Sequence, residues 1–169
     1  MLYQASPQHP YHLSVGTILI TKMNTFLVLY YPTSHNLTNI VKFPTGTIEE
    51  NEPLESTVKR ELLEETGLSG KVITYLGMQL TRDNWWGEIN QETAVEKATA
   101  FFLVALESDI TQQKISKELQ EKNVTLKEFT YQELVDHFSA QQEKDGMRDF
   151  NQIDFLHRAQ KYLEEHATL

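Results

Sequence analysis

The sequence predicts an α/β sandwich, in which a mixed β-sheet carries helices on its faces. Runs rich in Val, Ile, Leu and aromatic residues, of strand length and separated by polar turns, recur along the 169 residues. Two or three other stretches carry the caps or the apolar period of amphipathic helices. Five or six strands interleaved with two or three helices predict this fold class, and the length fits one domain with a sizeable core.

The N-terminal elements follow from their residue types. Residues 1–10 are polar with two prolines, so we expect a loose arm preceding a single domain of residues 11–169. Pro53 suits a first helical turn and Gly67 suits a C-terminal cap, so a helix is expected between them. Strands are expected at residues 12–20, 25–31 and 40–43, with a polar loop at 32–39.

The C-terminal half repeats this alternation. Thr130 followed by Glu133 is a capping-box pattern and predicts a helix that runs to residue 138. Residues 151–165 show the apolar spacing of an amphipathic helix. Strands are expected at residues 72–80, 98–106 and 124–129, with a polar loop at 81–97.

Composition excludes several functional classes. The net charge of −9 argues against a protein that binds a nucleic acid polymer, because such proteins are usually basic. The chain has no cysteine, so neither disulfides nor thiol chemistry are available. The longest apolar run, residues 100–106, is too short to span a bilayer, and no secretory signal is apparent. We therefore expect a cytoplasmic protein that does not bind membranes.

Residues 46–68 contain the most informative pattern. On the expected helix, Glu61, Glu64 and Glu65 stand at i, i+3 and i+4 and share one face. Adjacent glutamates alone usually mark a solvated helix face, but three carboxylates repel one another unless a cation lies among them. Mg²⁺ prefers oxygen ligands and often bridges to substrate phosphates.

The same stretch resembles the Nudix box, the signature of the MutT-related Nudix hydrolases. The box is a glycine, five residues, Glu, seven residues, Arg-Glu, an aliphatic residue, any residue, Glu-Glu, any residue, glycine and an aliphatic residue. The matching positions are Gly46, Glu52, Arg60, Glu61, Leu62, Glu64, Glu65, Gly67 and Leu68. The resemblance implies a Nudix-type α/β/α sandwich with a mixed β-sheet, in which the box forms a loop–helix–loop.

The resemblance also implies an activity, the attack of water on phosphorus in a diphosphate linkage, with Mg²⁺ or Mn²⁺ as cofactor. Arg60 is expected to orient the carboxylates, and Glu52 to act as an outer ligand or through Arg60. The general base stays open between a box glutamate and one of Glu88, Glu92, Glu96 and Glu107. The expected metal ligands are Glu61, Glu64, Glu65 and a backbone carbonyl near Thr45 or Gly46, with Gly46 preferred.

Specificity must come from residues outside the box. Trp85 and Trp86 could stack on a base or fold onto the core, and Lys42 and Arg82 could contact substrate phosphates. Subfamily marks argue against two substrates: position 83 is Asp where ADP-ribose hydrolases tend to carry proline, and position 84 is Asn where diadenosine-polyphosphate hydrolases tend to carry tyrosine. A nucleoside di- or triphosphate, or another nucleoside-diphosphate derivative, is therefore the expected small-molecule partner.

Two alternatives stay open at this point. One is a noncatalytic Nudix-fold domain that senses a nucleotide, although such domains often lose box glutamates and this chain keeps them. The other is a hydrolase of ADP-ribose or of dinucleoside polyphosphates despite the missing marks. The resemblance also makes a homodimer possible.

Overall fold

A computed structural model of the chain describes residues 2–6, 9–34, 37–84, 94–145 and 152–166. Its centre is a mixed, eight-stranded sheet in the order β4-β3-β2-β7-β6, with β1 and β5 also paired to β2 and β8 paired to β3. Strands β2 and β7 pair in parallel, and the other pairs are antiparallel. The strands are β1 (Leu2–Ser6), β2 (His9–Ile20), β3 (Phe26–Ser34), β4 (Leu37–Lys42), β5 (Thr45–Thr47), β6 (Gly70–Asn84), β7 (Ala94–Leu106) and β8 (Thr125–Phe129).

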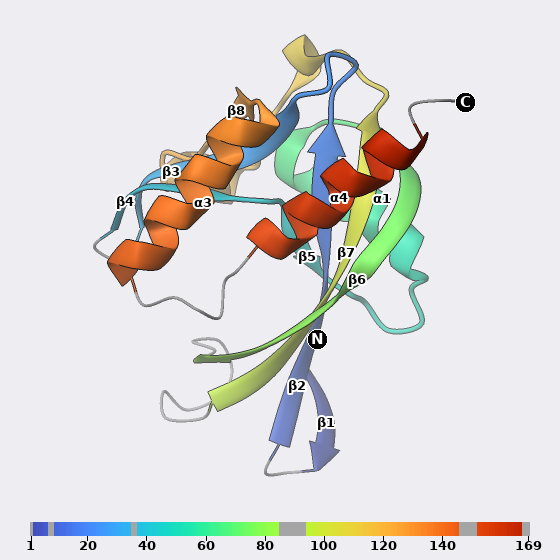
Figure 1. Ribbon diagram of the computed structural model, residues 1–169. Coiled ribbons are helices and arrows are strands. Elements are labelled where there is room, and N and C mark those ends of the chain that lie inside the picture. Colours follow the sequence, from blue (N-terminus) through green and yellow to red (C-terminus); the bar gives the residue numbers. More distant parts are fainter. Residues whose placement is uncertain (1, 7–8, 35–36, 85–93, 146–151, 167–169) are drawn as a thin grey trace.

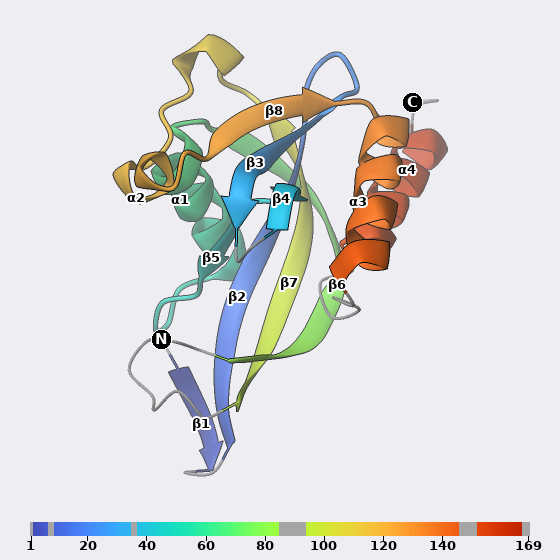
Figure 2. The same cartoon turned by 90° about the vertical axis from the view of Figure 1, so that its left-hand side faces the viewer.

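Helices cover both faces of this sheet. Figures 1 and 2 show α3 and α4 on one face and α1 on the other, with the short helix α2 beside α1. This layering confirms the predicted α/β/α sandwich. The helices are α1 (Leu54–Thr66), α2 (Lys117–Glu121), α3 (Tyr131–Asp145) and α4 (Ile153–His166), with a 3₁₀ turn η1 (Ile110–Gln112). No helix in the described ranges is long and apolar enough to cross a membrane.

Each face of the sheet has its own apolar core. Along β2, Val15 and Leu19 pack toward α1, whereas Ile18 and Ile20 pack toward α3 and α4. This alternation is the two-residue period of a strand buried on both faces. It explains why the sequence of β2 reads as an almost continuous apolar run.

The helix of the box begins and ends where its caps predict. Pro53 precedes the first turn in an extended conformation. Gly67 ends the helix in the left-handed region at φ 70°, and its N–H donates to the Leu63 carbonyl at 2.8 Å. Leu62 and Leu68 are fully buried, which confirms that both pack in the core.

Two predicted loops are shorter than expected. Strand β6 runs to Asn84 and β7 begins at Ala94, so residues 81–84 and 94–97 of the polar segment continue the β6–β7 ladder. In the same way β3 and β4 extend into the expected loop at 32–39. The prediction was wrong because backbone groups form the ladder whatever the polarity of the side chains they carry.

The structure also contains elements that the sequence did not indicate. Residues 2–6, expected to be loose, form β1 and pair antiparallel with β2. Strand β5 has only three residues, too few for a pattern, and is defined by its pairing to β2. Helix α2 is also short, and the Ser116 hydroxyl caps it by accepting from the Leu119 N–H. The boundary between arm and domain at residue 10 stays a prediction.

Candidate active site

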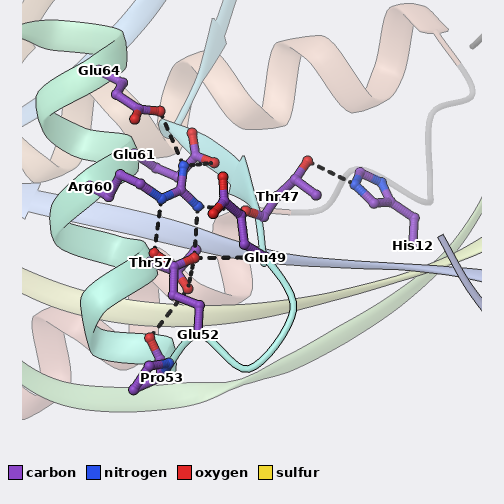
Figure 3. A network of polar contacts seen from close by, with 9 residues as sticks. All are labelled: His12, Thr47, Glu49, Glu52, Pro53, Thr57, Arg60, Glu61 and Glu64. Atoms are coloured by element: carbon purple, nitrogen blue, oxygen red, sulfur yellow. Dashed lines mark hydrogen bonds and ion pairs between the residues drawn. The ribbon is translucent and has the colours of Figure 1, made fainter. Parts of the chain in front are cut away.

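Arg60 lies at the centre of a polar network on α1, shown in Figure 3. Its guanidinium donates twice to Glu52, at 2.9 and 2.8 Å. It also donates to Glu61 at 2.9 Å and to Glu64 at 3.1 Å. A fifth bond of 2.9 Å goes to the Thr47 carbonyl of β5. Arg60 therefore joins three box carboxylates to the neighbouring strand.

The network shifts the ionisation of its members. Hydrogen bonds from Arg60 are the largest cause that lowers the pKa of Glu52 to about 2, and the Thr57 hydroxyl adds to them. In return, Glu52 raises the pKa of Arg60 above its ordinary value. The paired bond from Arg60 leaves Glu52 little freedom to turn toward a substrate. In this structure Glu52 is therefore held by Arg60.

Every second residue of β5 directs its backbone N–H and C=O groups toward the box. The bonds from Thr17 N–H to the Pro44 carbonyl and from Ile48 N–H to the Leu13 carbonyl place Gly46 in a hydrogen-bonded pair with Val15 of β2. The polar backbone groups of Thr45 and Thr47, the neighbours of Gly46, therefore point away from β2 and toward α1.

The contacts of the box agree with this alternation. Glu65 accepts a hydrogen bond from the Thr45 N–H, and Glu61 accepts one from the Thr47 N–H. In an extended strand the carbonyl of a residue points to the same edge as its N–H. The main-chain carbonyl that faces the box carboxylates is consequently that of Thr45, and the Gly46 carbonyl faces β2.

Gly46 allows α1 and β5 to approach each other closely. A Cβ atom built on Gly46 would lie 1.9 Å from the carboxyl carbon of Glu61. Its backbone φ is not positive, so the glycine is needed for close approach and not for a turn. The absence of a side chain lets the Glu61 carboxylate lie directly against β5.

We therefore expect Gly46→Ala to displace Glu61 and to reduce any metal-dependent activity by at least about tenfold. The measurement is activity together with circular dichroism. The matched control is Gly70→Ala, because its Cβ would meet the Val104 side chain at 2.5 Å and Leu62 at 3.3 Å, but no carboxylate of the box. Equal activity of Gly46→Ala and the native chain would contradict this role.

Glu65 is the most unusual ionisable group of the network. Burial, followed by the charge of Glu61, raises the pKa of Glu65 to about 8. Burial also raises the pKa of Glu61, although Arg60 opposes the shift. The Oε2 atom of Glu65 is buried and has no hydrogen-bond partner among the described residues. A buried carboxylate oxygen without a partner is costly, which indicates a position for a cation.

The oxygen atoms at this site suit Mg²⁺ or Mn²⁺, but the expected ligands are not all gathered around one point. Hard divalent cations take carboxylate and carbonyl oxygens, which Glu61, Glu65 and Thr45 supply side by side. Glu64 is different: its side chain is 59% exposed and bonded to Arg60. Among the residues that the structure describes, no three carboxylate or imidazole groups are already gathered as a metal site. Glu64 must change its side-chain conformation to join the other two.

The structure brings further charged groups to this site, and of these the sequence had singled out only Lys42. The charge of Glu118 on α2 acts on Glu65 and helps to raise the pKa of Tyr31 to about 12. The ammonium of Lys42, predicted to contact phosphates, lies over the Tyr31 ring at 5.3 Å from its centroid. Lys97 acts on Glu65 from β7 with a favourable charge.

His12 of β2 lies opposite Lys97 of β7. It is buried and shares a 3.0 Å hydrogen bond with the Thr47 hydroxyl. Burial is the main cause that lowers the pKa of His12 to about 4, so the imidazole is neutral near pH 7. No spacing in the sequence could have indicated His12 or Glu118, because β-pairing and chain packing bring them to the box.

The structure describes the remaining predicted site residues only in part or not at all. Trp85, Trp86, Glu88 and Glu92 lie outside the described residues. Arg82 is on β6 and Glu96 on β7, where only their backbone is described. Glu107 follows β7, and its N–H bonds to the Ser69 carbonyl.

Comparisons with known proteins identify a family and a fold. A sequence model of the NUDIX domain matches residues 10–150. The MutT protein from Methanosarcina mazei Go1 has a similar solved structure, with a TM-score of 0.59 and 19% sequence identity. The alignment covers 93% of this chain and 98% of that one, so it shows a shared fold. Curated proteins yielded no significant sequence match.

Proposed function

Because the chain belongs to the NUDIX domain family, we propose that it is a metal-dependent hydrolase of a diphosphate linkage in a nucleotide. Nudix proteins are generally hydrolytic, and this chain retains every glutamate of the box. The observation that carries the proposal is the buried, unpartnered Oε2 atom of Glu65 beside the Glu61 carboxylate. A buried carboxylate with a raised pKa and an oxygen without a partner is typical of functional sites, and a bound cation would supply the missing partner.

Glu61, Glu65 and the Thr45 carbonyl would hold the cation, and Glu64 would join them after leaving Arg60. We favour Thr45 over Gly46 as the main-chain ligand because of the strand alternation. A bound Mg²⁺ or Mn²⁺ would lower the pKa of a water molecule and neutralise charge on the phosphate oxygens. Arg60 keeps Glu61 in position through its bond to the Thr47 carbonyl.

Lys42 and Lys97 are the cations we propose for substrate phosphates. Lys42 lies above Tyr31 and Lys97 acts on Glu65, so the two reach the box from different strands. In an acidic chain, such local positive charge helps to attract a polyanion. Trp85, Trp86 and Arg82 stay predictions for binding the rest of the nucleotide.

Glu118 is our candidate for the general base outside the box. Its charge acts on both Glu65 and Tyr31, which places it beside the buried carboxylate of the box. We expect Glu118→Gln to lower kcat by about 10²- to 10⁴-fold, the usual contribution of a general base. Glu107→Gln is the matched control and should retain activity. The reverse ranking in steady-state kinetics would show that Glu107 is the base.

The function is tested with a substrate panel at millimolar Mg²⁺ and Mn²⁺. The panel contains nucleoside di- and triphosphates, nucleotide sugars, ADP-ribose and dinucleoside polyphosphates. Release of phosphate, pyrophosphate or a nucleoside monophosphate, abolished by EDTA, is the expected result. Binding of a nucleotide without turnover of any compound would instead support the noncatalytic sensor.

A further inference from the structure

Thr47, the last residue of β5, joins the box to a second polar group on the other face of the sheet. Its backbone serves the box, because the N–H donates to Glu61 and the carbonyl accepts from Arg60 at 2.9 Å. Its hydroxyl shares a 3.0 Å hydrogen bond with Nε2 of His12 on β2. Figure 3 shows His12 and the box residues on opposite sides of Thr47. Thr47 is therefore the residue through which His12 reaches the box.

The strand register explains why Thr47 can contact both groups. A Cβ atom on the preceding residue, Gly46, would meet Glu61 on α1. Successive side chains of a strand point to opposite faces, so the Thr47 side chain points away from the face that carries α1. Thr47 stands opposite Ser14, and His12 lies two residues from Ser14 on the same face of β2. The imidazole is thus the diagonal neighbour of the Thr47 hydroxyl, within reach across the two strands.

His12 is a fixed partner for this hydroxyl. It is only 4% exposed, and its pKa of about 4 keeps the ring neutral near pH 7, with one hydrogen-bond donor and one acceptor. Ser14 is directly opposite Thr47 but is engaged elsewhere, because its hydroxyl lies 2.7 Å from that of Thr99 on β7. The side chain that holds the Thr47 hydroxyl is consequently His12 and not Ser14.

Strand β5 is short, so this additional bond matters for its position. It has three residues, and its pairing to β2 covers only residues 14–16 of that strand. On the side of the box, Glu61 and Glu65 accept hydrogen bonds from its N–H groups. A movement of β5 would displace both carboxylates and the Thr45 carbonyl together. The position of β5 thus sets the geometry of the proposed metal site.

We propose that His12 is a positioning residue for the box, which holds the end of β5 through the hydroxyl of Thr47. In this arrangement His12 acts only through Thr47, whose backbone contacts Glu61 and Arg60. The consequence for metal binding rests on the proposed function, whereas the hold on β5 can be measured in the metal-free protein.

The first test measures hydrogen exchange of the backbone N–H groups of Thr45 and Thr47 in the metal-free protein. His12→Phe removes the hydrogen bond but keeps a flat ring. It should raise both exchange rates about tenfold, because the loss of one hydrogen bond lets β5 open more often. His12→Gln should restore slow exchange, since its amide nitrogen reaches about as far along the side chain as Nε2 of the imidazole.

The matched control for this test is Ser14→Ala. It removes a similarly buried polar group from the same strand but keeps the bond between His12 and Thr47. Its exchange rates at Thr45 and Thr47 should stay close to those of the native protein. Native rates in His12→Phe, or equal increases in His12→Phe and Ser14→Ala, would overturn the proposal.

The second test measures the affinity for Mn²⁺ by titration calorimetry. His12→Phe should weaken binding about tenfold, within the range found when a residue that supports a metal ligand is changed. Thr47→Val removes the same hydrogen bond from its other end and keeps the branched shape. The double variant should therefore bind Mn²⁺ no more weakly than His12→Phe alone.

The outcomes separate this inference from the proposed function. Losses of affinity that multiply in the double variant would show that His12 acts by a route other than Thr47, and would overturn the proposal. If the native protein bound no Mn²⁺ while His12→Phe still accelerated exchange in β5, the role of His12 in holding β5 would be supported and the proposed function would fall.

Discussion

Glu65→Gln is expected to lower kcat by at least about a hundredfold while the protein stays folded. The substitution keeps the shape of the side chain and its bond from Thr45, but it removes the charge that would bind the cation. Even residues that only support a metal ligand change affinity or activity by about 10- to 100-fold. Steady-state kinetics with Mg²⁺, together with thermal unfolding, measures both effects.

Glu64→Gln should show a similar loss, because Glu64 is proposed as the third ligand. Glu55→Gln is the matched control, since Glu55 is exposed in the first turn of the same helix and away from the Arg60 network. Substantial activity in both the Glu64 and Glu65 variants would remove the site assignment. Loss of activity in the control as well would show that the helix, and not the carboxylate, is the cause.

Metal affinity should depend on pH with a definite sign. The pKa of Glu65 is about 8 in the metal-free protein, so near pH 6.5 a cation must displace a proton from it. We expect Mn²⁺ to bind about tenfold more tightly for each pH unit between 6 and 8, and to release a proton as it binds. Calorimetry in buffers of different ionisation enthalpy measures that proton, which Glu65→Gln should abolish.

Arg60→Met is expected to lower the free energy of unfolding by about 3 kcal/mol. This is the largest effect that we expect on stability. Two partly buried carboxylates (Glu52 and Glu61), the exposed Glu64 and the Thr47 carbonyl would lose their common donor. Removing one partner of such a network leaves uncompensated charge and costs about 3–5 kcal/mol when it is fully buried. Urea unfolding at pH 7 measures the change, and Lys59→Met, an exposed position on the same helix, is the control.

The bond between Arg60 and Glu52 gives this stabilisation a dependence on pH. The pKa of Glu52 is lowered to about 2 in the folded protein from 4.5, so its contribution is complete above pH 4.5 and is lost as pH falls toward 2. The penalty of Arg60→Met should therefore be smaller at pH 3 than at pH 7. An equal penalty at both values would indicate that packing of the arginine, and not its charge, stabilises the helix.

Much of the fold follows from local sequence because the forces concerned are local. The cap at Gly67 requires only that residue's freedom at positive φ, and the strand β2 requires only its apolar side chains. The shared face of Glu61, Glu64 and Glu65 follows from helix geometry alone. The polar ends of β6 and β7 were missed because cross-strand pairing does not depend on their side chains.

By itself, then, the sequence determined the fold class, the helix of the box and the face on which its carboxylates lie. Only the tertiary structure decided that Thr45, and not Gly46, turns its carbonyl to the box, because strand pairing sets that orientation. The same holds for Glu118, which reaches Glu65 from a distant segment of the chain. Helix periodicity acts over a few residues and can be read directly, whereas contacts between distant segments exist only once the chain has packed.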